Sequence, residues 1–148
     1  MKQTLVVLVF ILAGLVDIAG QIRSSFDPNG GEFQVSDTKP KGFEDFQRMY
    51  LQTHNADGRP IHPKGGIEIG TLEYAMRKIV LNGRNWSFET GSIDGVRYIF
   101  RGRLSRIRHD EHGAVIGDRI LQGRLIKLLG GKISAAAYLV FSFVYYSD

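Results

Sequence analysis

The feature that most constrains this chain is a two-residue alternation of apolar and other side chains that begins near Asn82. Side chains two residues apart share one face of an extended strand, whereas a helix repeats every 3.6 residues. One face of the predicted strand at 96–104 contains Val96, Tyr98, Phe100, Gly102 and Leu104, and the other contains Arg97, Ile99, Arg101 and Arg103. This pattern predicts a sheet with one face turned to a core.

Turn dipeptides divide the alternating region into consecutive strands. Asn82-Gly83, Asp94-Gly95 and Gly130-Gly131 are typical of tight hairpin turns, and we expect a type I′ turn at the first of them. They predict paired strands at 74–81 and 84–91, followed by strands at 96–104, 120–129 and 133–146, with a loop at 109–117. The last strand is apolar on both faces, as a central or closing strand should be.

The region before residue 82 is less regular. Residues 43–55 fit helical or strand spacing, and we favour a strand at 47–54. Residues 67–82 also contain a helical alternative, but the hairpin signal favours a strand. The expected fold is mainly β, a single antiparallel meander of about 5–7 strands curved into a barrel or sandwich. Gly102 and Gly123 suggest bulges or sharp bends within strands.

The N-terminus predicts export. Lys2 precedes an apolar run over residues 5–16, which Asp17 ends. That run suits a cleavable signal peptide at 1–20 and is shorter than the roughly 20 residues of a spanning helix. An uncleaved N-terminal anchor is the alternative. We therefore expect a periplasmic or secreted protein, with no transmembrane helix after processing, a flexible N-terminal arm at 21–42 that contains a short strand near 33–35, and a β-domain at 43–148.

Composition narrows the chemistry. Hydrophobic residues make up 43% of the chain, which is ordinary for a globular protein. The chain contains no cysteine, which excludes thiolate nucleophiles and cysteine-ligated metals. The net charge of +4 is a modest basic bias that favours acidic partners such as anionic polysaccharides, lipid headgroups or nucleic acids without selecting among them.

Arginines on the predicted strand at 96–104 form one candidate site. Arg97, Arg101 and Arg103 share a face, and Arg124 or Lys78 on neighbouring strands would extend it into a stripe that binds phosphate, sulfate or carboxylate groups. The alternative is a charged face that serves only solubility. Nucleic acid is an unlikely partner, because no stacking aromatic side chains alternate with these arginines and the protein is expected to be exported.

The most site-like cluster in the sequence is a candidate metal-binding loop. His109, Asp110, Glu111 and His112 offer two imidazoles and two carboxylates, and His54 and His62 would add ligands if the loops met. The alternative is an ordinary polar hairpin loop, because a catalytic zinc site usually has three protein ligands in fixed geometry.

Two five-residue segments are alike. Residues 100–104 read Phe-Arg-Gly-Arg-Leu and residues 121–125 read Leu-Gln-Gly-Arg-Leu. The match fits an internal duplication or, as we favour, two neighbouring strands that bend at the same height of one sheet.

Three spaced patterns within residues 67–145 also have a family likeness. They are Asn82-Gly83-x-x-Trp86-Ser87-Phe88-Glu89-Thr90, Gly95-Val96-x-Tyr98-x-Phe100-x-Gly102, and Gly123-x-Leu125-x-Lys127 with Gly131-Lys132. The patterns resemble those of a group of small exported bacterial proteins of unassigned function. The resemblance implies a shared β fold and no particular activity.

Taken together, these observations predict an exported, non-catalytic β-domain that binds a partner or supports the envelope. The expected partner is an anionic or apolar small ligand or an envelope component, and we expect no cofactor. One alternative is a metal-dependent hydrolase that uses the loop from His109 to His112. The other is a small outer-membrane barrel, which would need at least eight strands and would turn the Tyr and Phe residues of 138–146 toward lipid rather than a core.

Overall fold

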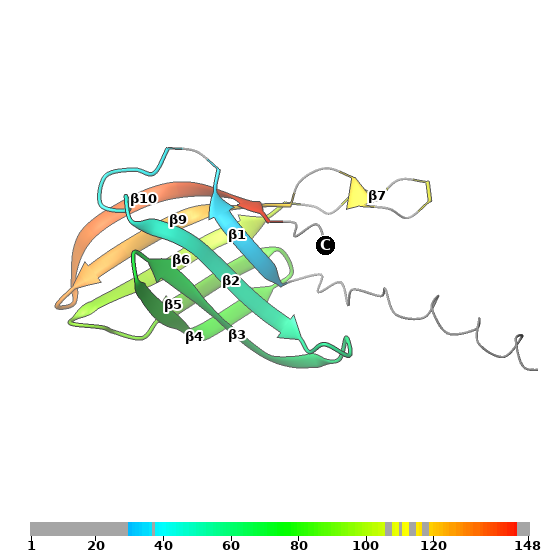
Figure 1. The fold of residues 1–148 in the computed structure, drawn as a ribbon, viewed down its shortest axis with the longest axis horizontal. Coiled ribbons are helices and arrows are strands. Elements are labelled where there is room, and N and C mark those ends of the chain that lie inside the picture. Colours follow the sequence, from blue (N-terminus) through cyan, green and yellow to red (C-terminus); the bar gives the residue numbers. More distant parts are fainter. Residues whose placement is uncertain are drawn as a thin grey trace, which may run out of the picture.

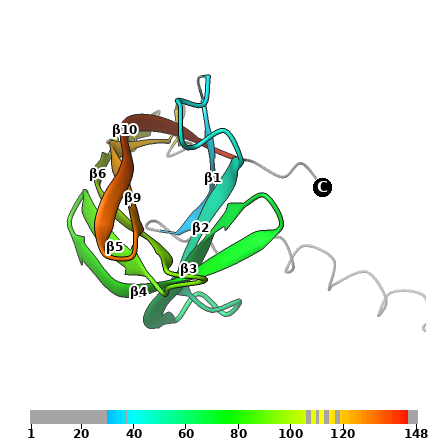
Figure 2. The ribbon, with the colours of Figure 1, turned by 90° about the vertical axis from the view of Figure 1, so that its left-hand side faces the viewer.

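Eight antiparallel strands form a closed barrel (Figures 1 and 2). The computed structural model describes residues 30–36, 38–105, 108–109, 111–112, 115–116 and 119–144. The barrel strands are β1 (Gly31–Val35), β2 (Phe46–His54), β3 (Pro60–Ile69), β4 (Leu72–Asn82), β5 (Asn85–Thr90), β6 (Val96–Leu104), β9 (Ile120–Leu129) and β10 (Lys132–Phe143). The strands β7 (Arg108–His109) and β8 (Val115–Ile116) form a separate two-stranded sheet.

The topology is an up-and-down meander. Each barrel strand pairs with the next along the chain, and β10 pairs with β1 to close the ring. The predicted antiparallel meander is confirmed as a barrel, and the predicted number of 5–7 strands is too small. Within the described ranges, no helix is long and apolar enough to cross a membrane.

The sequence analysis did not predict β3, which contains Pro60, Pro63, Gly65 and Gly66. These residues normally interrupt strands, but residues before Gly66 pair with β2 only, and a strand with one free side tolerates proline. The glycines are required by the close approach of β2. A Cβ atom on Gly65 would lie 2.2 Å from the carbonyl oxygen of Tyr50, and one on Gly66 would lie 2.9 Å from its hydroxyl oxygen.

The closing strand β1 contains the short strand predicted near residues 33–35 and makes it part of the barrel. It lies inside the segment expected to be a flexible arm, yet it pairs with both β2 and β10. Phe33 on β1 is fully buried, and its ring packs edge-on against Trp86 at 5.6 Å between centroids. The barrel domain therefore includes residues 31–35, because a single buried phenylalanine anchors a strand whose neighbours are turn-forming residues.

The core is largely aromatic. Phe100 stacks on Phe88 at 5.3 Å and meets Phe141 edge-on at 5.8 Å. The predicted inward face of β6 is confirmed, because Tyr98, Phe100 and Leu104 are buried while the arginines of the same strand point outward. Interdigitated rings of this kind are how an eight-stranded barrel fills its interior with side chains.

Gly102 and Gly123 lie directly opposite each other on β6 and β9. The two similar segments thus lie on neighbouring strands at the same height of the sheet. The pairing continues there without a register shift, so of the two predicted features, a bulge or a sharp bend, the bulge is absent. A Cβ atom on Gly102 would lie 2.3 Å from Cζ of Phe100, and one on Gly123 would lie 2.4 Å from the Arg101 carbonyl oxygen. The glycines leave the space that the Phe100 ring occupies.

The hairpin turns follow the predicted glycines with one difference. At Gly83-Arg84 only the glycine has positive φ, at 56°, which fits a type II′ turn rather than the predicted type I′ turn. At Asp94-Gly95 both central residues have positive φ, 49° and 77°, as a type I′ turn requires.

We expect Gly102→Ala to lower the free energy of unfolding by about 1–3 kcal/mol, because the added methyl group overpacks the core. Urea unfolding followed by Trp86 fluorescence measures this. Gly91→Ala is the matched control, since a Cβ atom there would lie nearest the flexible Arg77 side chain, at 3.3 Å, and would be 3.9 Å from the Ala75 carbonyl oxygen. Equal stability of the two variants would refute the packing role of the glycine pair.

We also expect the barrel to lose stability above pH 10. Burial, followed by the neighbouring Tyr74, raises the pKa of Tyr98 from 10.0 to about 12. The folded state thus favours the neutral phenol, so its contribution is complete below pH 10 and is lost as pH rises through about 12. Urea midpoints between pH 8 and pH 11.5 should fall less in Tyr98→Phe than in the parent protein, whereas Tyr138→Phe, at an exposed ring, should leave the profile unchanged.

Candidate anion-binding face

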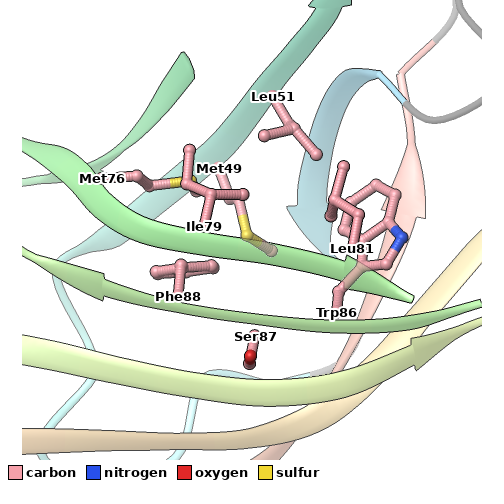
Figure 3. Close-up of a pocket in the computed structure, with 8 residues that line it drawn as sticks. All are labelled: Met49, Leu51, Met76, Ile79, Leu81, Trp86, Ser87 and Phe88. Atoms are coloured by element: carbon pink, nitrogen blue, oxygen red, sulfur yellow. The ribbon is translucent and has the colours of Figure 1, made fainter. Parts of the chain in front are cut away.

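Apolar side chains pack the interior of the barrel, and one gap among them lies near β4. There β3 and β4 diverge, and the gap forms beneath them (Figure 3). Its lining consists of Met49, Leu51, Met76, Ile79, Leu81, Trp86, Ser87 and Phe88. The gap has no room for a water molecule, so the expected apolar ligand finds no space there.

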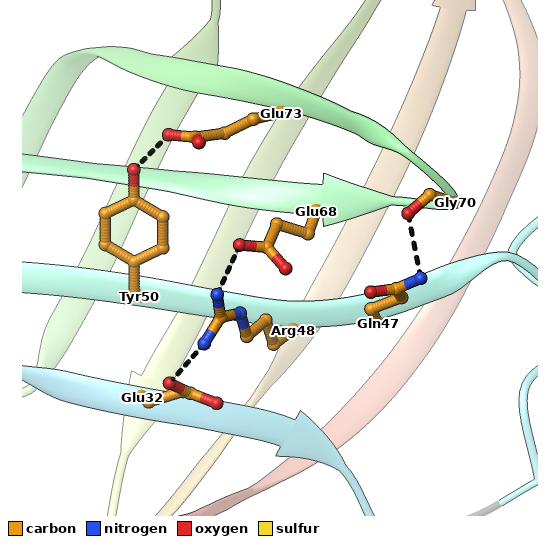
Figure 4. Close-up of polar contacts among 7 residues, drawn as sticks. All are labelled: Glu32, Gln47, Arg48, Tyr50, Glu68, Gly70 and Glu73. Atoms are coloured by element: carbon orange, nitrogen blue, oxygen red, sulfur yellow. Dashed lines mark hydrogen bonds and ion pairs between the residues drawn. The ribbon is translucent and has the colours of Figure 1, made fainter.

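On the outer surface over β1 to β4, Arg48 has carboxylate partners on both neighbouring strands (Figure 4). Arg48 donates from Nη1 to Glu32 at 2.8 Å and from Nη2 to Glu68 at 2.6 Å. The hydrogen bond from Arg48 lowers the pKa of the Glu68 carboxyl. Beside this bridge, the Tyr50 hydroxyl donates to a carboxylate oxygen of Glu73. Arg48, the cation at the centre of this surface, is therefore already paired with two carboxylates.

Glu89 on β5 neutralises one end of the predicted arginine stripe. Its Oε2 lies 3.0 Å from Nζ of Lys78 and 3.3 Å from Nη1 of Arg97. The Lys78 hydrogen bond, followed by the charges of Lys78, Arg97 and Arg101, lowers the pKa of Glu89. Arg97 and Lys78 thus share a carboxylate and are less able to attract an external anion.

Arg101, Arg103 and Arg124 remain, and we call them the arginine face. Arg101 lies directly opposite Arg124 across β6 and β9, and Arg103 lies opposite Gln122. All three arginines are exposed, and none forms an ion pair with another described residue. The sequences of β6, β9 and β10 contain no Asp or Glu. The outer face of these three strands therefore carries an excess of positive charge.

An open hollow of about 310 Å³ adjoins the arginine face where β6 ends and β9 begins. Its lining consists of Arg84, Arg103, Leu104, Ser105, Ile120 and Gln122. The Ser105 hydroxyl accepts a hydrogen bond from the Ile120 amide at 2.9 Å, which ties the two strand ends together. Guanidinium groups at such a rim can bind carboxylate, sulfate or phosphate oxygens in bidentate fashion.

Tyr138 extends the arginine face onto β10. The sequence analysis did not identify it as a surface residue. Its backbone pairs with Arg124, which in turn pairs with Arg101. The assignment of the 138–146 aromatics to the core is correct for Phe141, which is fully buried, but wrong for Tyr138, which is 65% exposed. The error has a simple cause, because β10 is apolar at both alternating positions and its sequence does not mark the outer face.

The predicted metal loop is only partly described. His109 lies on β7 opposite Val115, whereas Asp110 lies outside the described residues. Glu111 and His112 are exposed, with His112 Nε2 3.5 Å from Glu111 Oε1. Among the residues that can be placed, no three His, Asp or Glu side chains gather as a metal site. Metal binding stays a prediction.

Arg119 is a buried charge that sequence reasoning did not single out. Its Nη1 donates to the Gly30 carbonyl at 2.9 Å, and its guanidinium carbon lies 4.7 Å from the ring centroid of Phe143. Its own carbonyl accepts a hydrogen bond from the Phe143 amide at 3.0 Å. Arg119 therefore ties the start of β1 to the end of β10, which is a structural role.

No protein-family model, curated protein or solved structure matches this chain.

We expect Arg124→Gln to stabilise the barrel by about 0.2–1 kcal/mol at low ionic strength, because like charges directly opposite in a sheet are destabilising. The gain should disappear in 0.5 M salt, where exposed charges are screened. Urea unfolding at both salt concentrations measures it. Lys64→Gln on β3 is the charge-matched control, and an equal gain in both variants would show that net charge, rather than the Arg101–Arg124 pair, is responsible.

Proposed function

We propose that the protein is an exported, non-catalytic barrel domain that binds an anionic ligand or partner through the arginine face. One observation carries the proposal. Arg101, Arg103 and Arg124 are exposed on neighbouring strands without carboxylate partners in the described structure, on a side of the barrel whose strand sequences contain no acidic residue.

The contrast with Arg48, Lys78 and Arg97 supports this proposal. Arg48 has two carboxylate partners, and Lys78 and Arg97 share one. The direct opposition of Arg101 and Arg124 lowers stability, and a bound anion would relieve that repulsion. The gap beneath β3 and β4 has no room for a water molecule, which also favours a binding surface on the outside of the barrel.

The barrel has the number of strands that the outer-membrane alternative requires. Its interior and outer face do not have the polarity that this alternative requires. A transmembrane barrel has an apolar band facing lipid and a polar interior. Here the interior is apolar and largely aromatic, while arginines and glutamates occupy the outer face. The hydrolase alternative has no supporting observation among the described residues.

Inorganic polyphosphate is a suitable first probe because it supplies charge without other chemistry. We expect the purified protein to bind it in low salt and to lose affinity as salt increases. The triple variant Arg101→Ala, Arg103→Ala, Arg124→Ala should bind at least about tenfold more weakly, because three charge-assisted contacts are removed. Isothermal titration calorimetry gives the affinities.

A second triple variant controls for net charge. Lys41→Ala, Arg59→Ala and Lys64→Ala remove the same charge from exposed positions on the β1–β2 loop, the β2–β3 turn and β3. This control should retain most of the affinity. Equal weakening of both triple variants, or no binding by the parent protein, would contradict the proposed function.

A further inference from the structure

We propose that the anion bound by the arginine face is an acidic polysaccharide, with one sugar ring on Tyr138 and its charged substituents on Arg124, Arg101 and Arg103. This inference rests on the proposed function and specifies its ligand class. The arginines supply attraction for any anion, whereas Tyr138 supplies a flat apolar surface that a simple inorganic anion cannot use.

The geometry forms a row across four adjacent strands. Ser87 on β5 pairs with Arg101 on β6, which pairs with Arg124 on β9, which pairs with Tyr138 on β10. Neighbouring strands are about 4.8 Å apart, so the row spans roughly 14 Å. That length fits an extended polymer of several units better than a single small anion. Arg103 and Gln122 form the next step of the same surface toward the open hollow.

Tyr138 has the surroundings of a stacking platform. Its side chain is 65% exposed, and Ala136, its exposed neighbour on the same outer face of β10, is small enough to leave the approach open. The face of an aromatic ring carries partial negative charge, which attracts the C–H groups on the apolar side of a sugar ring. Hydroxyl groups of that sugar would find the Gln122 side chain, whose backbone pairs with Val140 on β10, and a sugar at the far end of the row would find Ser87.

The same surface is less suited to nucleic acid. Proteins that bind single strands stack successive bases on several aromatic side chains. Tyr138 is the sole aromatic side chain facing outward on the described parts of β5, β6, β9 and β10. Glu89 places a carboxylate beside the Arg97 end, so a polyanion would extend toward Arg103 instead.

Dextran sulfate and polyphosphate at equal charge concentration separate sugar recognition from charge recognition. We expect Tyr138→Ala to weaken dextran sulfate binding about two- to tenfold and to leave polyphosphate binding unchanged, because only the sugar contacts the ring. Tyr138→Phe, which keeps the ring, should bind like the parent protein. Ile133→Ala removes another exposed apolar side chain of β10 and should have no effect.

The outcomes distinguish this inference from the proposed function. If the arginine triple variant loses both polymers while Tyr138→Ala loses neither or loses both equally, the sugar assignment is wrong and the anion-binding face stands. If the parent protein binds neither polymer, both proposals fail. Tighter binding of single-stranded poly(dT) than of dextran sulfate, with dependence on Tyr138, would overturn the polysaccharide in favour of nucleic acid.

Discussion

The contact between Gly102 and Gly123 fixes the part of the barrel on which the candidate site depends. Their backbones lie face to face beneath the Phe100 ring, and a Cβ atom on Gly123 would come within 2.4 Å of the Cα atom of Gly102. A slip of one residue between β6 and β9 would place larger side chains in that space and would turn every side chain to the opposite face. The same register sets Arg101 opposite Arg124 and Arg103 opposite Gln122 on the outside. Packing within the core thus determines how the outer charges are arranged.

The sequence predicted the second half of the barrel better than the first, for a physical reason. From Asn82 onward, β5 and β6 alternate regularly, and two-residue turns join β4 to β5 and β9 to β10, so local pattern and final structure agree there. In β3 and β1 the strand is specified by distant partners. Gly65 and Gly66 make room for Tyr50, and Phe33 reaches the core beside Trp86. Neither requirement can be recognised from a short stretch of sequence. Gly65 and Gly66, which satisfy the first requirement, are residues that typically interrupt strands.

The sequence predicted that arginines form the candidate site, but it did not predict which residues lie at the two ends of the site. Alternation alone places Arg101 and Arg103 on one face, and the structure places Arg124 beside them. Arg97 does not belong to the arginine face because it forms an ion pair with Glu89 on the adjacent strand. That pair could be recognised only from the observed register of β5 and β6. Tyr138 was missed because β10 has apolar side chains at both alternating positions. Which of its faces is inner follows only from barrel closure, since the strand must turn Leu139 and Phe141 to the core.

Arginine rather than lysine at these positions bears on what the face can bind. A guanidinium is less strongly hydrated than an ammonium and presents a planar set of donors, so opposed arginines are well placed to share one sulfate, phosphate or carboxylate group. Each exposed side chain loses about 0.5–1.5 kcal/mol of rotamer freedom when it is fixed by a ligand. A single anion that orders all three arginines would recover little net affinity. A polymer that contacts Arg101, Arg124 and Arg103 in turn gains from each later contact at high effective concentration. The arrangement therefore favours a multivalent partner over a small ion.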